Sequence, residues 1–210
     1  MGDEPQQWDR FWREGDFARR HTTPPEYMPE LVTLFRKRRA NSILDLGCGT
    51  GRVMAYLVSK GFLVVGQDIS PLGLGMAQRA MSSASTRNFV LVNHDVTVLP
   101  FPDRSFDAVI SINAIHHNRL RDIKRAVKEI YRVLSPKGLL FVNLTARAEI
   151  RDGEKVERGT YRTRDGTEKG ILHHLFTASE IRSTFKDYRI LQLTPPSEGK
   201  PHWLLLAEKR

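Results

Sequence analysis

The sequence predicts an α/β fold in which a mostly parallel sheet is covered by helices on both faces. From residue 42 onward, short apolar strands alternate with helical stretches, a pattern typical of parallel sheets. The first strand ends on Asp45 and runs into alternating glycines, and the second strand also ends on a carboxylate, Asp68. A chain of 210 residues suits one compact domain, since domains commonly contain about 100–200 residues. We therefore expect residues 1–210 to form a single domain.

The elements follow from apolar periodicity and from the residues that end helices. We expect strands at residues 42–46, 62–68, 88–93, 106–112 and 138–144, and helices at residues 27–39, 51–60, 71–83 and 119–134. Gly61 fits a helix C-terminal cap, and the turn residues from Ser135 to Gly138 end the last of these helices. Each predicted helix is thus followed by a new strand.

The C-terminal part predicts one more helix and two final strands. Thr177 can cap a helix that runs to Phe185, and Glu180 three residues later completes a capping box. Strands near residues 188–194 and 202–208 are joined by a short turn. Two strands joined in this way must be antiparallel.

Two segments lie outside the alternation of strands and helices. The N-terminal arm, residues 1–40, begins with aromatic side chains at short intervals, namely Trp8, Phe11, Trp12 and Phe17. They predict an amphipathic helix or lid that either docks on the core or contacts a ligand directly. Residues 146–176 are charged, poor in aliphatic side chains and marked by Asp-Gly turn signals at 152–153 and 165–166. This region predicts one or two inserted hairpins, which would also serve as a lid.

The glycine turn after the first strand is the strongest functional signal. The pattern Asp45-x-Gly47-x-Gly49-x-Gly51 lets a ligand lie against the main chain, because glycine has no side chain and permits positive φ angles. Asp68, at the end of the next strand, stands about where a ribose-binding acid belongs. The third glycine comes one residue too early for the dinucleotide fingerprint, so a dinucleotide enzyme is only a minor alternative.

This acid-first pattern resembles motif I of the class I S-adenosylmethionine-dependent methyltransferases. The resemblance is strong over residues 42–144 and continues more loosely to the C-terminus. It implies a Rossmann-like seven-stranded methyltransferase sheet whose last strand is antiparallel to the others. Among the small members of the family, the sequence is similar to tellurite-resistance-like, menaquinone-biosynthesis-like and wobble-uridine tRNA enzymes. Residues His173 to Thr177 and Pro201 to Leu204 look most like the first of these groups.

The resemblance also implies a cofactor, S-adenosyl-L-methionine, with S-adenosyl-L-homocysteine as its product. Asp45 would hold the methionine end, while Gly47 and Gly49 let the cofactor approach the backbone. Asp68, with Ile69 beside it, would bind the ribose hydroxyls, and charge-assisted hydrogen bonds of this kind are strong. The remaining cofactor-binding residues carried over from the family are, for the adenine, Asp95 and Val96 and, for the methionine part, Asn113.

Methyl transfer from a sulfonium is an in-line displacement, and positioning of the acceptor can supply much of its rate. A base is needed only if the acceptor must lose a proton, and a histidine of ordinary pKa would suit that task. His116 is the candidate that we expect, ahead of His117, His173 and His174, and each of them can instead be a packing or surface residue.

We expect no metal site. Adjacent histidines on a helix or strand point in different directions, and no pair is spaced four residues apart along a helix. The one cysteine, Cys48, lies inside the glycine turn and excludes both a disulfide and a cysteine cluster.

The formal charge of +9 raises the question of an anionic partner. Its largest local excess lies between Arg119 and Lys137, where basic residues also suit a solvated helix. We expect a small-molecule acceptor, with tRNA or other RNA as the alternative and a non-catalytic cofactor-binding module as a third possibility. No apolar run approaches the roughly 18 residues needed to span a bilayer, and the first residues do not resemble a secretory signal, so we expect a cytoplasmic protein that does not enter membranes. The sequence leaves the oligomeric state open.

Overall fold

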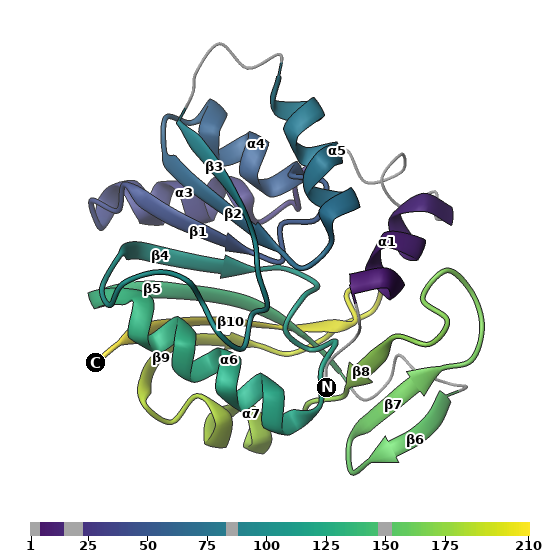
Figure 1. Cartoon of the computed structure of the whole chain (residues 1–210). Helices are drawn as coiled ribbons and strands as arrows, with labels where there is room; N and C mark the ends of the chain where they lie inside the picture. The colour runs from purple at the N-terminus through teal and green to yellow at the C-terminus, as the bar shows by residue number, and fades with distance from the viewer. Residues whose placement is uncertain (1–4, 15–22, 83–87, 147–152) are drawn as a thin grey trace.

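The computed structural model describes residues 5–14, 23–82, 88–146 and 153–210 (Figure 1). Its main sheet has seven strands in the order β3-β2-β1-β4-β5-β10-β9. The strands are β1 (Ser42–Leu46), β2 (Leu63–Asp68), β3 (Phe89–Asn93), β4 (Phe106–Ser111), β5 (Leu134–Thr145), β9 (Tyr188–Thr194) and β10 (His202–Lys209). The helices are α1 (Pro5–Glu14), α3 (Met28–Lys37), α4 (Arg52–Ser59), α5 (Pro71–Met81), α6 (Leu120–Val133) and α7 (Ala178–Thr184).

Strand directions confirm the predicted sheet. The pairs β1·β2, β1·β4, β2·β3 and β4·β5 are parallel, and β10 is antiparallel to both β5 and β9. The last strand therefore inserts between β5 and β9 against the direction of its neighbours. Because the parallel strands all end at the same edge, that edge collects their carboxyl-end residues.

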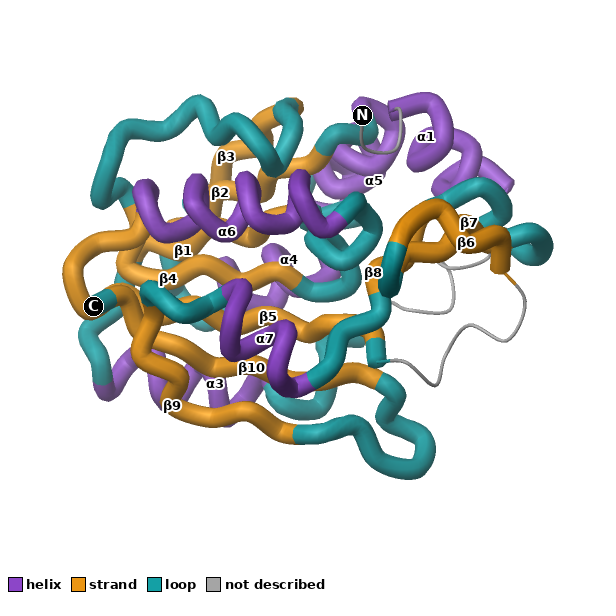
Figure 2. The backbone as a smooth tube through the Cα atoms, turned by 90° about the horizontal axis from the view of Figure 1, so that it is seen from below, coloured by secondary structure: helices purple, strands orange, loops and turns teal. Residues whose placement is uncertain are grey.

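Helices cover both faces of the sheet, as Figures 1 and 2 show. Ile43 faces a core formed with α3 and α4, while the next residue, Leu44, faces the core formed with α6 and α7. This alternation is the two-residue period of a strand, and both faces are apolar because both are covered. Each fully buried aliphatic side chain contributes roughly 1.5–3 kcal/mol to folding.

One predicted boundary is wrong. The residues from Ser135 to Gly138, expected as a turn before the strand, belong to β5, which begins at Leu134 and pairs there with Phe106. The pairing register shifts between Phe106 and Ala108, and Lys137 adopts a φ of 62°. The turn signal is thus accommodated as an irregularity inside the strand.

The predicted insertion contains a second, three-stranded sheet of β6 (Gly153–Glu157), β7 (Thr160–Thr163) and β8 (Leu172–His174). The tight turn of its hairpin includes Gly159, with a φ of 81°, instead of the expected Asp152-Gly153, whose first residue lies outside the described part. The amide of His174 donates to the carbonyl of His116 at 2.8 Å, so β8 is tied to the loop after β4.

Helix α1 lies beside this small sheet in Figure 1. Arg10 on α1 donates to the carbonyl of Lys169, between β7 and β8. Of the predicted aromatic series, Phe17 lies outside the described residues. Among the described helices, none combines the length and the apolar character that crossing a bilayer requires.

Candidate active site

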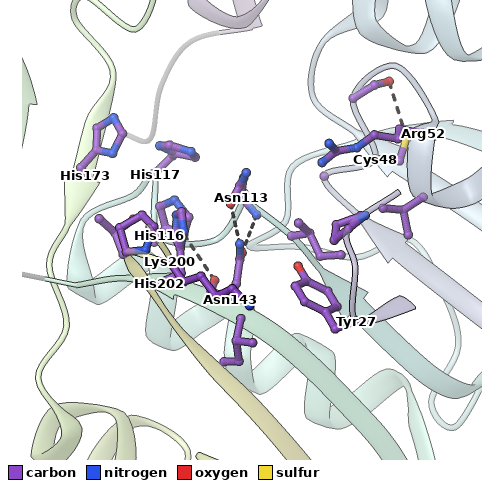
Figure 3. Close-up of a pocket in the computed structure, with 18 of the residues that line it drawn as sticks. Tyr27, Cys48, Arg52, Asn113, His116, His117, Asn143, His173, Lys200 and His202 are labelled. Carbon is purple, nitrogen blue, oxygen red and sulfur yellow. Dashed lines mark hydrogen bonds between the residues drawn. The ribbon is translucent and has the colours of Figure 1, made fainter. Parts of the chain in front are cut away.

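The site lies at the carboxyl edge of the sheet, where β1, β2 and β4 end. A cavity of about 1290 Å³ opens there and is lined by Asp45, the glycine turn, Asn113 and several histidines (Figure 3). A smaller cavity of about 70 Å³ is lined by Asp68, Ile69, Asp95, Val96 and Asn113, among others. The structure therefore brings all the predicted cofactor residues and His116 to the two cavities of one edge.

The glycine turn is required by the protein's own packing as well as by any ligand. Gly47 and Gly49 have φ angles of 74° and 53°. A Cβ on Gly47 would lie 2.3 Å from the Cβ of Ala114, in the loop after β4. Glycine at position 47 thus also lets the loops after β1 and β4 touch, a reason beyond the ligand and the positive φ angle that the sequence suggested.

Asp68 holds the glycine turn against the end of β2. One carboxylate oxygen accepts from the amide of Gly49 at 2.7 Å, and the other accepts from the amide of Ser70 at 2.9 Å. The side chain is buried, and this burial raises the pKa of its carboxyl above the ordinary value. Its oxygens are oriented by backbone donors at the mouth of the smaller cavity.

Asp45 carries a buried oxygen with no partner. The side chain is 2 % exposed, and its Oδ2 makes no hydrogen bond to any described residue. Burial, followed by repulsion from Asp68, raises the pKa of its carboxyl to about 7. A buried carboxylate in this state is stabilised by a cationic partner, and the ammonium group of a bound amino acid is one. The residues present therefore fit the methionine end of the expected cofactor.

The residues expected around the adenine lie on the loop after β3. Oδ1 of Asp95 accepts from both the amide and the hydroxyl of Thr97 at 2.7 Å, which fixes the turn that carries Val96. Asn93, which the sequence analysis did not single out, donates to the carbonyl of Asp68 and to that of Ile69, each at 2.9 Å. The sequence signal that could have identified Asn93 is its place as a polar residue at the end of a strand.

Asn143 was also missed. It lies in β5, is 5 % exposed, and its amide oxygen accepts from the backbone N–H of Asn113 at 2.6 Å. Its NH₂ group donates to the side-chain oxygen of Asn113 at 2.5 Å. Asn113 has a φ of 52°, a conformation that asparagine tolerates better than most residues.

Four histidines, namely His116, His117, His173 and His202, line the cavity and lie on its far side from Cys48 of the glycine turn, as Figure 3 shows. His116, His117 and His173 are 2 %, 4 % and 7 % exposed. Burial, reinforced by the neighbouring imidazoles, holds the pKa of His116 well below its ordinary value and lowers that of His117 to about 3. Both rings are therefore neutral at pH 7, and His116 is a weak base. His174 faces elsewhere and bonds to Thr160 and Glu180.

Helix α1 covers the glycine turn, where the expected cofactor would bind. A Cβ on Gly49 would lie 2.6 Å from the indole ring of Trp12, and one on Gly73 would lie 2.9 Å from the indole nitrogen. Asp9 accepts from the hydroxyl of Ser70 at 2.5 Å and from the amide of Leu72 at 3.1 Å, at the start of α5. Asp9 is a third residue that sequence reasoning missed, because one acid in a charged helix gives no signal.

Comparison with known proteins supports one family. Residues 43–138 match the family described as "Methyltransferase domain". The chain is 37 % identical over 113 residues to the demethylmenaquinone methyltransferase of Thermus thermophilus. This match covers 53 % of this chain and 50 % of that protein. It is 35 % identical over 120 residues to "Probable tRNA methyltransferase 9B" of Mus musculus, covering 56 % of this chain and 25 % of that protein. The chain thus spans a quarter to a half of the length of these relatives.

A solved structure of an S-adenosylmethionine-dependent methyltransferase from Clostridium acetobutylicum superposes with a TM-score of 0.74 at 15 % identity, covering 96 % of this chain and 98 % of that one. At this identity the likeness speaks for the fold. Motif, sheet topology, sequence relatives and fold all agree. Residues 43–138 thus match a methyltransferase domain, and the chain resembles the class I S-adenosylmethionine-dependent methyltransferases in motif, sheet topology and fold.

Proposed function

We propose that the chain transfers a methyl group from S-adenosyl-L-methionine to a small-molecule acceptor. The single observation that carries the proposal is the large cavity, which has the glycine turn and Asp45 at one side and the histidines at the other. A cofactor held at the first side would present its sulfonium toward the second. The large cavity has a volume of about 1290 Å³, which exceeds the roughly 300–1,000 Å³ of a typical small-ligand pocket. The cavity therefore has room for cofactor and acceptor together.

In this proposal each predicted residue has one task. Asp68 accepts hydrogen bonds from the ribose hydroxyls, with Ile69 beside it, and Asp95 and Val96 border the adenine. Asp45 holds the cofactor's ammonium group, and Gly47 and Gly49, whose Cβ positions face Ala114 and Trp12, border the methionine part with their backbone. Asn113 presents backbone atoms to the methionine part, held in place by Asn143.

The acceptor occupies the histidine side of the cavity. Transfer then depends on holding an acceptor lone pair in line with the methyl carbon and the leaving sulfur. Helix α1 and the 153–174 sheet form the lid. Arg10 bonds to Lys169, and the rings of Trp8 and His117 meet edge to face with centroids 5.0 Å apart. The first contact joins the two parts of the lid, the second rests α1 on the loop after β4, and together they would exclude water from the cavity.

RNA is the second candidate, favoured by the formal charge and by the relative named as a tRNA methyltransferase. Several basic residues near the site nonetheless have acidic partners. Arg121 and Arg125 both pair with Asp122, and Arg119 pairs with Glu157. The dense basic run at residues 36–39 directly precedes β1, so it lies at the opposite edge of the sheet. A continuous phosphate-binding surface at the cavity is therefore not favoured.

Two experiments test the proposal. Formation of S-adenosylhomocysteine is measured with a panel of small thiol, hydroxyl, amine and quinol acceptors, and turnover with at least one is the expected result. Filter binding to bulk tRNA across a salt series is the second, because phosphate contacts make affinity fall steeply with salt. Tight, salt-sensitive tRNA binding together with no turnover of any small acceptor would replace this proposal with the RNA alternative.

A further inference from the structure

The histidine cluster is more than a group of packed rings. His116 and His117 have ring centroids 4.2 Å apart, and His117 and His173 have centroids 4.5 Å apart. One ligand nitrogen from each of the three lies within 4.8 Å of the other two. All three rings are buried, and all three line the large cavity. The geometry alone therefore places three imidazole nitrogens around one point of the cavity.

The hydrogen bonds orient two of these rings in the manner of metal ligands. Nδ1 of His116 lies 3.4 Å from the carbonyl oxygen of Asn143, and Nδ1 of His117 lies 3.2 Å from that of Leu172. A carbonyl only accepts, so each Nδ1 carries the proton and each Nε2 keeps its lone pair. Metal-ligating histidines almost always donate their other nitrogen to such an acceptor.

The third ring has an acidic neighbour. Nε2 of His173 is buried and lies 3.2 Å from a carboxylate oxygen of Glu168, close enough for an ion pair, although it makes no hydrogen bond to a described residue. The ring of His173 faces the two oriented rings.

The three ligand nitrogens lie close enough together for small side-chain movements to bring them onto one ion. A tetrahedral zinc ion with bonds of about 2.1 Å holds its nitrogen ligands roughly 3.4 Å apart. The present upper limit of 4.8 Å requires the rings to close by about 1.4 Å at most, which side-chain rotation can supply. Glu168 lies on the same side and balances positive charge, whereas Lys200, which also lines the cavity, pairs with Glu26.

We propose that His116, His117 and His173 form a three-histidine site for a divalent first-row transition ion, with Zn²⁺ as the reference ion, whose fourth position opens to the acceptor side of the cavity. Three protein ligands and one open position are the composition of catalytic zinc sites, whereas structural sites are closed by four ligands. The sequence analysis expected no metal, since adjacent histidines diverge on a strand or helix. His116 and His117 lie instead in the turn after β4, where that rule does not hold.

A role for the ion follows only if the proposed function is correct. A hydroxyl or thiol acceptor bound at the fourth position would lose its proton to solvent more easily, since the ion stabilises the anion. Its oxygen or sulfur then forms the bond to the methyl carbon while the bond from carbon to the sulfonium breaks, and that sulfur keeps the electron pair as a neutral thioether. No protein base is needed for this step.

The test is metal binding by the full chain. Protein stripped with a chelator is titrated with ZnCl₂ by calorimetry, and CoCl₂ is added to a second sample as an absorbing probe of the ligands. The wild type is expected to bind one ion per chain and to give the intense visible bands of tetrahedral cobalt. The variants His173→Ala and His173→Asn are expected to bind at least ~100-fold more weakly. His94→Ala removes a histidine outside the cluster and is expected to bind as the wild type does.

A titration with S-adenosylhomocysteine separates this inference from the proposed function. Wild-type protein that binds S-adenosylhomocysteine but shows no Zn²⁺ binding at micromolar concentrations overturns the metal site alone. Zn²⁺ binding that persists unchanged in both His173 variants overturns it as well. Protein that binds Zn²⁺ and not S-adenosylhomocysteine keeps the metal site and overturns the proposed function. The same S-adenosylhomocysteine titration reports whether each variant is folded.

Discussion

Asn113 and Asn143 are joined by two hydrogen bonds, of 2.6 and 2.5 Å, between the loop after β4 and the C-terminal end of β5. The pair fixes Asn113 in its left-handed conformation at the point where the large and small cavities meet. The backbone oxygen of Asn143 also accepts from His116. One residue of β5 thus positions both a predicted cofactor residue and a member of the histidine cluster.

Replacement of Asn143 by leucine, which keeps its size and removes its polar atoms, is expected to lower both stability and turnover. The Asn113 amide loses its acceptor, and a buried unpaired group costs roughly 1–3 kcal/mol. Chemical denaturation measures the first effect and methyl transfer the second. Asn88→Leu, at an exposed asparagine just before β3, serves as the control. If the variant binds the cofactor and turns over as the wild type does, Asn143 does not position the site.

Replacement of Asp45 is expected to stabilise the fold and to weaken cofactor binding. Its folded-state pKa of about 7 exceeds the ordinary value of 3.8, so between about pH 4 and 7 the folded state binds more protons than the unfolded state. Its contribution therefore destabilises the protein increasingly as the pH rises through that window. Asp45→Asn is expected to raise the melting temperature at pH 8, by about 2–4 °C for each kcal/mol recovered, with little change at pH 4.

The same substitution is expected to weaken cofactor binding, because the ammonium group loses its carboxylate. In the wild type, affinity should fall below about pH 7 by up to about tenfold per pH unit, since Asp45 must first lose its proton. Calorimetric titrations between pH 5.5 and 8 measure this profile. A flat profile, or an Asp45→Asn variant less stable than the wild type at pH 8, is incompatible with the assignment.

Gly49 and Trp12 are expected to be energetically coupled. Gly49→Ala adds a methyl group 2.6 Å from the indole at a φ of 53°, so it brings both backbone strain and a clash. Gly61→Ala is the matched control, since Gly61 has a φ of 90° with nothing within 4 Å, and isolates the strain at roughly 1–2 kcal/mol. The double variant Gly49→Ala/Trp12→Ala should be less destabilised than the sum of its parts in denaturant unfolding. Additive effects would mean that α1 does not rest on the glycine turn.

The sequence was sufficient to predict that Asp45, the glycines and Asp68 lie at one edge of the sheet, because its signals there are local. Asp45, the glycines and Asp68 each mark the end of an apolar strand, and a parallel sheet brings such ends to one edge. The antiparallel final strand followed from a short connection and from the family resemblance. The position of Gly47 against Ala114 was not predictable in the same way, since it depends on how closely two loops approach.

The histidine side could not be derived because its geometry depends on long-range packing. His173 reaches His117 only because the amide of His174 bonds to the carbonyl of His116, which joins segments almost 60 residues apart in sequence. Asn143 looked like one polar residue in a buried strand until β4 and β5 paired. Trp12 was one aromatic among several, and no local pattern showed that it would lie over Gly49.

The central claim is that a sulfonium nucleoside binds at the ends of β1 and β2, with its ribose held by Asp68. Calorimetric titration of S-adenosylhomocysteine into the wild type and into Asp68→Asn tests it most directly. The account predicts a measurable 1:1 affinity for the wild type and a loss of about 10- to 100-fold for the variant, the effect of weakening one or two charge-assisted hydrogen bonds. Absence of heat with folded wild-type protein, or equal affinities in the two proteins, would contradict it.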